Sequence, residues 1–94
     1  MPLLFEWDQR KAGSNLAKHG VCFDEAATVF GDTLSITIPD PLHSEDEHRY
    51  VLIGHSHRSR LLVVVHTDRG DRTRIISARP ATRKERLCYE KNEE

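Results

Sequence analysis

The pattern of apolar and polar residues changes from strand to helix and back to strand along the chain. Residues 3–7 are mostly apolar and predict a short first strand. Asp8 is a good helix N-cap and Gly20 a good helix stop, so we expect a helix between them. Three of its residues recur at helical spacing: Ala12, Leu16 and His19. A second, short helix is expected from an Asp24 cap to Phe30.

Beyond these helices the period is that of strands. Apolar and polar residues alternate over residues 34–38, which predicts a half-buried strand. Two more strands are expected over residues 49–57 and 60–67. The latter contains the run Leu-Leu-Val-Val-Val at 61–65. An uninterrupted apolar run of this kind predicts the centre of the sheet, buried on both faces.

The last part of the chain predicts a hairpin, a strand and a helix. The sequence Asp-Arg-Gly-Asp at 68–71 is typical of a hairpin turn, and residues 72–79 predict the strand that follows. Thr82 and Glu85 have the spacing of a capping box, which opens a final helix that reaches about Asn92. The predicted order is β-α-α-β-β-β-β-α. This is an α+β fold with a mainly antiparallel sheet, two N-terminal helices and one C-terminal helix.

Size and composition favour a small cytoplasmic protein. Ninety-four residues predict a single domain over 1–94. No apolar stretch approaches the roughly 20 residues of a membrane span, and the N-terminus lacks the basic segment and apolar core of a signal peptide. Cys22 and Cys88 lie far apart and in no metal-binding spacing, so we expect two reduced thiols.

The charges are segregated, although the net charge is only −1. Nine of the 14 Lys and Arg residues lie between Arg58 and Arg86 with three acidic residues, a net charge of +6. The stretch from Gly20 to His48 has seven acidic residues and no Lys or Arg, a net charge of −7. The cationic segment indicates a phosphate site that something shields when it is not in use. The acidic run over 40–47 is a dimer contact, a counter-charge or a solvated loop.

The last strand carries the strongest candidate chemistry. Simple alternation places Arg72, Arg74, Ile76 and Ala78 on one face and Thr73, Ile75, Ser77 and Arg79 on the other. Arginine binds phosphate oxygens in pairs through its planar fork, and Arg79 leads into a helix N-terminus that favours an anion. Arg83, Lys84 and Arg86 extend this region. The alternative is a solvated basic surface with some arginines paired to Glu85, Glu90 or the acidic loop.

Other candidate sites are weaker. Lys18 and His19 at a helix end could complete a phosphate site or move a proton, or they could simply complement the helix dipole. The six histidines form no ligand set that their spacing enforces, so neither a metal nor another cofactor is expected. The cysteines have no activating partner in the sequence. Arg58 occupies the position where a serine hydrolase elbow needs glycine.

The ordered set of these residues resembles the BrnT toxins. The resemblance covers nearly the whole chain, with gaps only in loops. It rests on F-E-W-D at 5–8, Asn15, K-H-G at 18–20, Phe23, Glu25, Ala26, Phe30, Asp32, Arg49, Gly54, Ser56, R-I-I-S-A-R at 74–79, Arg83, Glu85, Arg86, Tyr89 and Glu90. Pro80 departs from the family, which often has another basic residue there, so the cationic region has one charge fewer.

The resemblance implies a bacterial type II toxin–antitoxin system and a fold similar to RelE-type ribonucleases. A BrnA-type antitoxin with a ribbon-helix-helix part would hold the toxin inactive. The two proteins would form a 2:2 complex that represses its own promoter. Contact with operator DNA would then belong to the antitoxin alone.

A ribonuclease of this size needs no metal, because the 2′-hydroxyl of RNA is its own nucleophile. We expect Arg74 and Arg79 to clamp the scissile phosphate, with Lys18 close by. His19 or Glu85 would transfer the proton, and Tyr89 would stack a base or donate a hydrogen bond. Further RNA contacts are expected from Ser77, Arg83 and Arg86. The alternatives are a non-catalytic nucleic-acid-binding module, an inactive partner of an antitoxin and, least favoured, a DNA-binding repressor acting alone.

Overall fold

The computed structural model describes residues 3–40 and 48–93, with side chains for all of these except residues 92 and 93. Its strands are β1 (Leu4–Glu6), β2 (Ile36–Pro39), β3 (Arg49–His55), β4 (Leu61–Arg69) and β5 (Arg72–Pro80). Its helical segments are α1 (Gln9–His19), α2 (Phe23–Thr28), the 3₁₀ turn η1 (Val29–Gly31) and α3 (Arg83–Glu93). The order of these elements confirms the predicted α+β fold.

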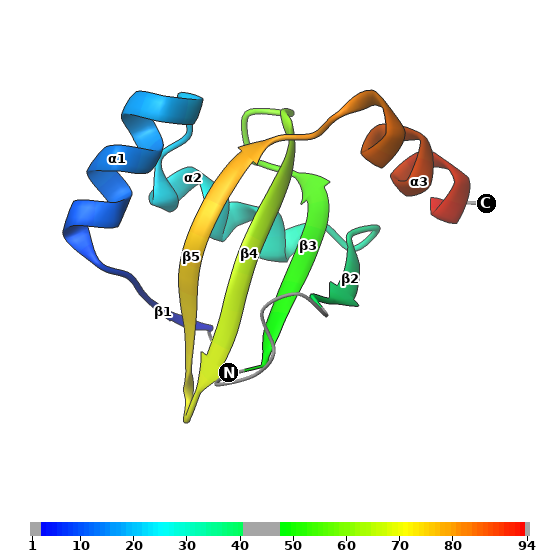
Figure 1. Cartoon of the computed structure of the whole chain (residues 1–94). Helices are drawn as coiled ribbons and strands as arrows, with labels where there is room; N and C mark the ends of the chain where they lie inside the picture. The colour runs from blue at the N-terminus through cyan, green and yellow to red at the C-terminus, as the bar shows by residue number, and fades with distance from the viewer. Residues whose placement is uncertain (1–2, 41–47, 94) are drawn as a thin grey trace.

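The strands form one sheet in the order β1-β5-β4-β3-β2 (Figure 1). β1 runs parallel to β5, and the other neighbouring strands are antiparallel. β4 is therefore the central strand, as its apolar run predicts. The turn between β4 and β5 contains Gly70 at a φ of 64°, a conformation that glycine adopts without strain.

Helices cover both faces of the sheet. On the face of α1 and α2, the buried core consists of Val21, Phe23, Ala26, Val29, Leu52, Leu62, Val64, Ile75 and Ala78. On the other face, Tyr89 of α3 is buried in a smaller cluster with Ile53, Leu61 and Val63. Consecutive residues of β4 therefore enter the two clusters alternately. This confirms that the central strand is buried on both faces.

α1 begins and ends as predicted, but it packs through a polar residue. The Asp8 carboxylate accepts hydrogen bonds from two amides of the first turn, and Gly20 ends the helix at a φ of 71°. Leu16, expected on the apolar side, is 51% exposed, while Asn15 is buried. The reason is the short β1, whose pairing with β5 ends at Arg74 and leaves the next part of that edge uncovered.

Asn15 takes the place of a neighbouring strand at this edge. Its Oδ1 accepts from the Ala78 amide at 3.1 Å, and its Nδ2 donates to the Ala78 carbonyl at 2.7 Å. Nδ2 also donates to the Val21 carbonyl at 2.9 Å. One side chain thus satisfies three buried backbone groups that would otherwise lack partners.

The second helix starts earlier than predicted. Its N-cap is Cys22, whose Sγ accepts a hydrogen bond from the Glu25 amide at 3.4 Å. Asp24 lies inside the first turn, where its negative charge interacts favourably with the positive end of the helix dipole. Glu25 is buried, and beginning the helix at Phe23 turns this side chain towards the interior. The predicted Asp24 cap is therefore wrong.

A β-bulge changes the faces of β5. Val65 pairs with Ser77 and His66 pairs with Ile75, so Ile76 has no partner in the register. An extra residue of this kind breaks the alternation of side chains. Ile75 and Ala78 consequently lie in the same core cluster. The predicted division of the strand into two alternating faces is wrong beyond the bulge.

The remaining strand and helix ends fall within two residues of their predicted positions. The acidic run lies, except for Asp40, outside the described residues, so its three alternatives remain predictions. Within the described part of the chain, no helix is long and apolar enough to cross a membrane.

Candidate functional site

Arg79 and Glu85 form a bidentate ion pair where β5 leads into α3. Nη1 of Arg79 donates to Oε1 of Glu85 at 2.7 Å, and Nη2 donates to Oε2 at 2.8 Å. The hydrogen bonds from Arg79 lower the pKa of Glu85 to about 2, against the opposing effect of burial. The carboxylate is therefore ionised at neutral pH and acts only as an acceptor.

Glu85 also completes the predicted capping box of α3. The Thr82 amide donates to Oε1 of Glu85 at 2.8 Å, and the Glu85 amide donates to the Thr82 hydroxyl at 3.2 Å. A general base works best when its pKa lies near the working pH. With a pKa of about 2, Glu85 is suited to orient Arg79 rather than to exchange protons.

Arg74 lies towards the other end of β5 and has its own partner. Its Nη1 donates to Oε2 of Glu6 on β1 at 3.1 Å. Arg74 pairs with Thr67 and Arg79 pairs with Val63, so four residues of β4, or about 13 Å, separate the two arginines along the sheet. Different carboxylates hold them, and the structure does not bring them together around one phosphate.

Three of the predicted site residues lie together between α1 and β5, away from the Arg79–Glu85 pair. Lys18, His19 and Ser77 line a shallow groove of about 210 Å³ between α1 and the free edge of β5. Its other lining residues are Lys11, Ser14, Asn15 and Ile76. Arg79 lies opposite Val63, on the α3 face of the sheet. Ser77 pairs with Val65, two residues from Val63, so Ser77 and Arg79 lie on the same face of β5, and the groove lies at the free edge of this strand.

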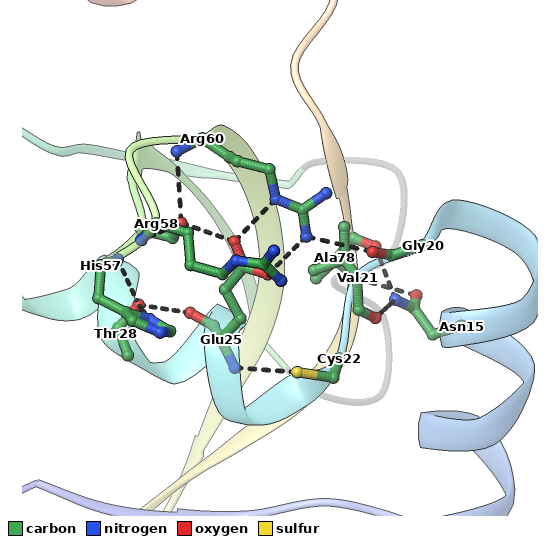
Figure 2. A network of polar contacts seen from close by, with 11 residues as sticks. Asn15, Gly20, Val21, Cys22, Glu25, Thr28, His57, Arg58, Arg60 and Ala78 are labelled. Carbon is green, nitrogen blue, oxygen red and sulfur yellow. Dashed lines mark hydrogen bonds and ion pairs between the residues drawn. The ribbon is translucent and has the colours of Figure 1, made fainter.

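A buried ion pair, which the sequence pattern did not predict, ties the β3–β4 hairpin to α2 (Figure 2). Glu25 is 2% exposed, and its Oε2 accepts from Nε of Arg60 at 2.9 Å and from the Ser56 hydroxyl at 2.7 Å. The hydrogen bonds from Arg60 lower the pKa of Glu25 to about 2, although burial opposes this. Arg60 also donates to the Gly20 carbonyl at 3.1 Å.

This network neutralises part of the positive charge in the cationic segment between Arg58 and Arg86. Arg60 is bound to Glu25, and Nη1 of Arg58 lies 4.0 Å from the same carboxylate. These contacts join the β3–β4 hairpin to α2 and to the end of α1. One feature of the sequence could have indicated this buried ion pair, namely a glutamate inside a short helix that is otherwise mostly apolar.

Tyr89 is a buried residue rather than a surface one. It is 2% exposed, and its hydroxyl donates to Oδ2 of Asp32 at 2.7 Å. Its ring leaves no free face, so a base cannot stack on it in this structure. Oδ2 of Asp32 also accepts from the His55 amide at 2.8 Å. Burial raises the pKa of Asp32, but the amides of His55 and Leu34 and the Tyr89 hydroxyl together lower it.

Across 3–40 and 48–93, no group of three or more His, Cys, Asp or Glu could hold a metal ion. Both cysteines are free thiols: Cys22 caps α2 and Cys88 is exposed on α3. His55 and His57 have different partners, Tyr89 and Thr28.

Comparison with known proteins agrees with the resemblance drawn from the sequence. The sequence model of a family described as "Ribonuclease toxin, BrnT, of type II toxin-antitoxin system" matches residues 7–85. No curated protein sequence matches the chain.

Among solved structures, the fold is similar to the crystal structure of the Brucella abortus ribonuclease toxin BrnT. The TM-score is 0.64 at 22% sequence identity, and the match covers 87% of this chain and 100% of that one. The family match extends over most of the chain and includes both β5 and the start of α3. This chain therefore belongs to the BrnT family of ribonuclease toxins of type II toxin–antitoxin systems.

Proposed function

We propose that this chain is an endoribonuclease that cleaves RNA without a metal ion and thereby arrests growth. The observation that carries the proposal is the Arg79–Glu85 pair, which fixes a guanidinium at the junction of β5 and α3. Three exposed cations follow on the first turns of that helix: Arg83, Lys84 and Arg86. A fixed arginine followed by exposed positive charge on the next helix suits the recognition of a phosphodiester.

In this proposal Arg79 stabilises the charge that develops on the scissile phosphate. Its side chain is 39% exposed. The pair with Glu85 occupies two of the five N–H donors of arginine and a bond of 3.3 Å to the Pro80 carbonyl a third, so two remain for phosphate oxygens. Glu85 restricts the rotation of the guanidinium, which lowers the entropy lost when a phosphate binds. We assign Glu85 to orientation and not to proton transfer.

We assign the groove between α1 and β5 to the RNA backbone away from the reacting bond. Lys18, His19 and Ser77 line it together with Lys11. These side chains supply positive charge and hydrogen-bond donors, which is what phosphate and ribose contacts require. Arg74, held by Glu6, would contact a different phosphate from the one at Arg79.

A type II toxin family implies an antitoxin partner. We propose that the partner here is a BrnA-type antitoxin in a 2:2 complex in the cytoplasm, with contact to operator DNA made by the antitoxin. An acidic segment of the antitoxin laid over the first turns of α3 would block the site and neutralise its charge together.

The test is to induce the chain alone in bacteria beside two variants and to run total RNA on a gel. We expect growth arrest and RNA decay with the wild type and neither with Arg79→Ala, because the phosphate loses its fixed cation. Arg72→Ala, an exposed arginine of the same strand, is the matched control and should remain toxic. Cleavage of RNA by purified protein should persist in excess EDTA.

Two results would contradict the proposal. Arg79→Ala with full toxicity would remove Arg79 from the site, and intact RNA in growth-arrested wild-type cells would exclude the ribonuclease itself. A non-catalytic RNA-binding protein is the second candidate, because Arg74 and Arg79 are both already neutralised by carboxylates. It would bind RNA with strong salt dependence and yield no cleavage products.

A further inference from the structure

His55, the last residue of β3, lies beside the buried Tyr89–Asp32 pair. Its Nδ1 is 3.1 Å from the Tyr89 hydroxyl, and the two rings meet edge to face with centroids 5.1 Å apart. Its backbone amide is fixed by Asp32, and Nδ1 lies 3.9 Å from the same carboxylate oxygen. The side chain is nevertheless 40% exposed. His55 is thus fixed on one side and accessible on the other.

The hydrogen bonds determine which ring nitrogen carries the proton. An ionised carboxylate only accepts hydrogen bonds, so the contact of 2.7 Å between Tyr89 and Asp32 uses the single hydroxyl proton of Tyr89. The Tyr89 oxygen can then only accept from His55. Nδ1 must therefore be protonated, and in the neutral ring Nε2 is the free acceptor. This nitrogen lies on the side of the ring away from Tyr89.

The same part of the molecule contains the Arg79–Glu85 pair. Glu85 and Tyr89 are four residues apart on α3 and so lie on the same face of the helix, one turn apart. Across the sheet, Val63 pairs with Arg79 on one side and with Ile53 on the other. His55 follows Ile53 by two residues and shares its face. His55 and Arg79 therefore flank α3 on one face of the sheet.

We infer that Nε2 of His55 is the general base of the proposed ribonuclease reaction, with Tyr89 and Asp32 as its positioning residues. This inference rests on the proposed function. The 2′-hydroxyl gives its proton to Nε2 while O2′ attacks phosphorus. The P–O2′ bond forms, the P–O5′ bond breaks, and the departing O5′ takes a proton from water. The products are a 2′,3′-cyclic phosphate and a 5′-hydroxyl, and His55 returns its proton to the solvent.

The other described histidines suit this role less well. His48 is exposed just before the other end of β3. His19 lines the groove between α1 and the free edge of β5, and none of the residues that line this groove comes from α3. His57 is exposed on the hairpin, where its ring and its amide both meet the Thr28 hydroxyl. His66 is 6% exposed between the rings of Phe30 and Tyr50. His55 alone among these combines a defined proton position with access from the surface on the face of Arg79.

The experiment measures cleavage of a short RNA by the purified chain, in the wild type and in four variants. His55→Ala and His55→Gln should each lower kcat by about 100-fold or more with little change in KM, since general base catalysis contributes about 10²–10⁴-fold. Gln keeps an amide donor for Tyr89, so its loss of activity cannot be attributed to packing. His57→Ala is the matched control and should retain full activity. Added imidazole should restore part of the activity of His55→Ala.

The fourth variant tests the positioning residues. Tyr89→Phe keeps the buried ring but removes the acceptor of Nδ1. The ¹⁵N chemical shifts of the His55 ring report the tautomer directly. We expect protonated Nδ1 and bare Nε2 in the wild type and a mixture of tautomers in Tyr89→Phe. The opposite tautomer in the wild type would overturn the inference.

The kinetic results distinguish the proposed role of His55 from the ribonuclease function on which it rests. A wild type that cleaves RNA while both His55 variants cleave equally well would overturn the role of His55 and leave the ribonuclease standing. A wild type that binds RNA but releases no cyclic phosphate would overturn both. Loss of activity in the two His55 variants, with imidazole rescue and a functional His57→Ala, would establish the base.

Discussion

Gly54 shows how closely β3 passes the segment between η1 and β2. A Cβ atom at this position would lie 2.9 Å from Cβ of Ser35, 3.0 Å from Cγ1 of Val29 and 3.0 Å from Oδ2 of Asp32. No side chain fits such a gap without a shift of its neighbours. The close approach also lets the next residue, His55, bind Asp32 through its amide. A single glycine therefore serves both packing and the candidate site.

We expect Gly54→Ala to destabilise the fold by about 1–3 kcal/mol, the usual cost of forcing a methyl group into a packed interior. Gly13→Ala in the middle of α1 is the control, because a Cβ there meets nothing within 4 Å. That change should stabilise the protein by about 0.5–1 kcal/mol through helix propensity. Urea unfolding measures whether each variant has a lower or a higher free energy of unfolding than the wild type. Equal values for the two variants would contradict the close approach at Gly54.

At the scale of elements, polar side chains hold together parts of the structure that strand pairing does not reach. Asn15 completes the free edge of β5 through the backbone of Ala78. Glu25 joins α2 to the β3–β4 hairpin through Arg60 and Ser56. Each contact is long-range in sequence. Asn15 replaces the backbone pairing that the short first strand does not supply, whereas Glu25 binds side chains of the hairpin.

We expect Glu25→Gln to lower the free energy of unfolding by about 1–3 kcal/mol at pH 7, because Arg60 and Ser56 lose a charged acceptor. The folded-state pKa of Glu25, about 2, lies below its ordinary value of 4.5. The stabilisation is therefore fully present above pH 4.5 and is lost as the pH falls towards 2.

Unfolding curves of the wild type and of Glu25→Gln between pH 7 and pH 3 test the direction of this pH dependence. The difference in stability should be constant down to about pH 5 and should then narrow. A difference that widens on acidification would mean that Glu25 is not bound to Arg60 as an anion.

At the scale of the whole molecule, the cationic segment is partly neutralised within the fold. Arg60, Arg74 and Arg79 each pair with a glutamate. The first turns of α3 keep Arg83, Lys84 and Arg86 exposed. The expected alternative of paired arginines thus holds for part of the segment, and α3 presents three of its exposed cations.

If α3 contacts RNA, its charges will appear in the salt dependence of binding. We expect Arg86→Ala to reduce the slope of log K against log salt by about 0.7 for single-stranded RNA, the value for one phosphate contact. Arg72→Ala, on β5 near the hairpin, should leave the slope unchanged. Fluorescence anisotropy over a salt series measures both, and equal slopes for Arg86→Ala and the wild type would place the RNA elsewhere.

The local pattern of the sequence was sufficient to predict the elements. Caps at Asp8, Gly20 and Thr82, the apolar run of β4 and the Gly70 turn all depend on residues within a few positions of one another. For the same reason the element order and the central place of β4 followed from periodicity. The family was identified from an ordered set of residues and is confirmed by the family match.

The local pattern of the sequence did not determine the contacts between distant residues. The bulge at Ile76 depends on the register of β5 against β4, and it places Arg74 and Arg79, opposite Thr67 and Val63, on the same face of the sheet. Asp32, His55 and Tyr89 meet only because β3 and α3 pack on the same region, 23 to 57 residues apart in the chain. Sequence alone thus determined the elements and the family. Tertiary packing decided the grouping of the site residues, because long-range register and burial are properties of the assembled sheet.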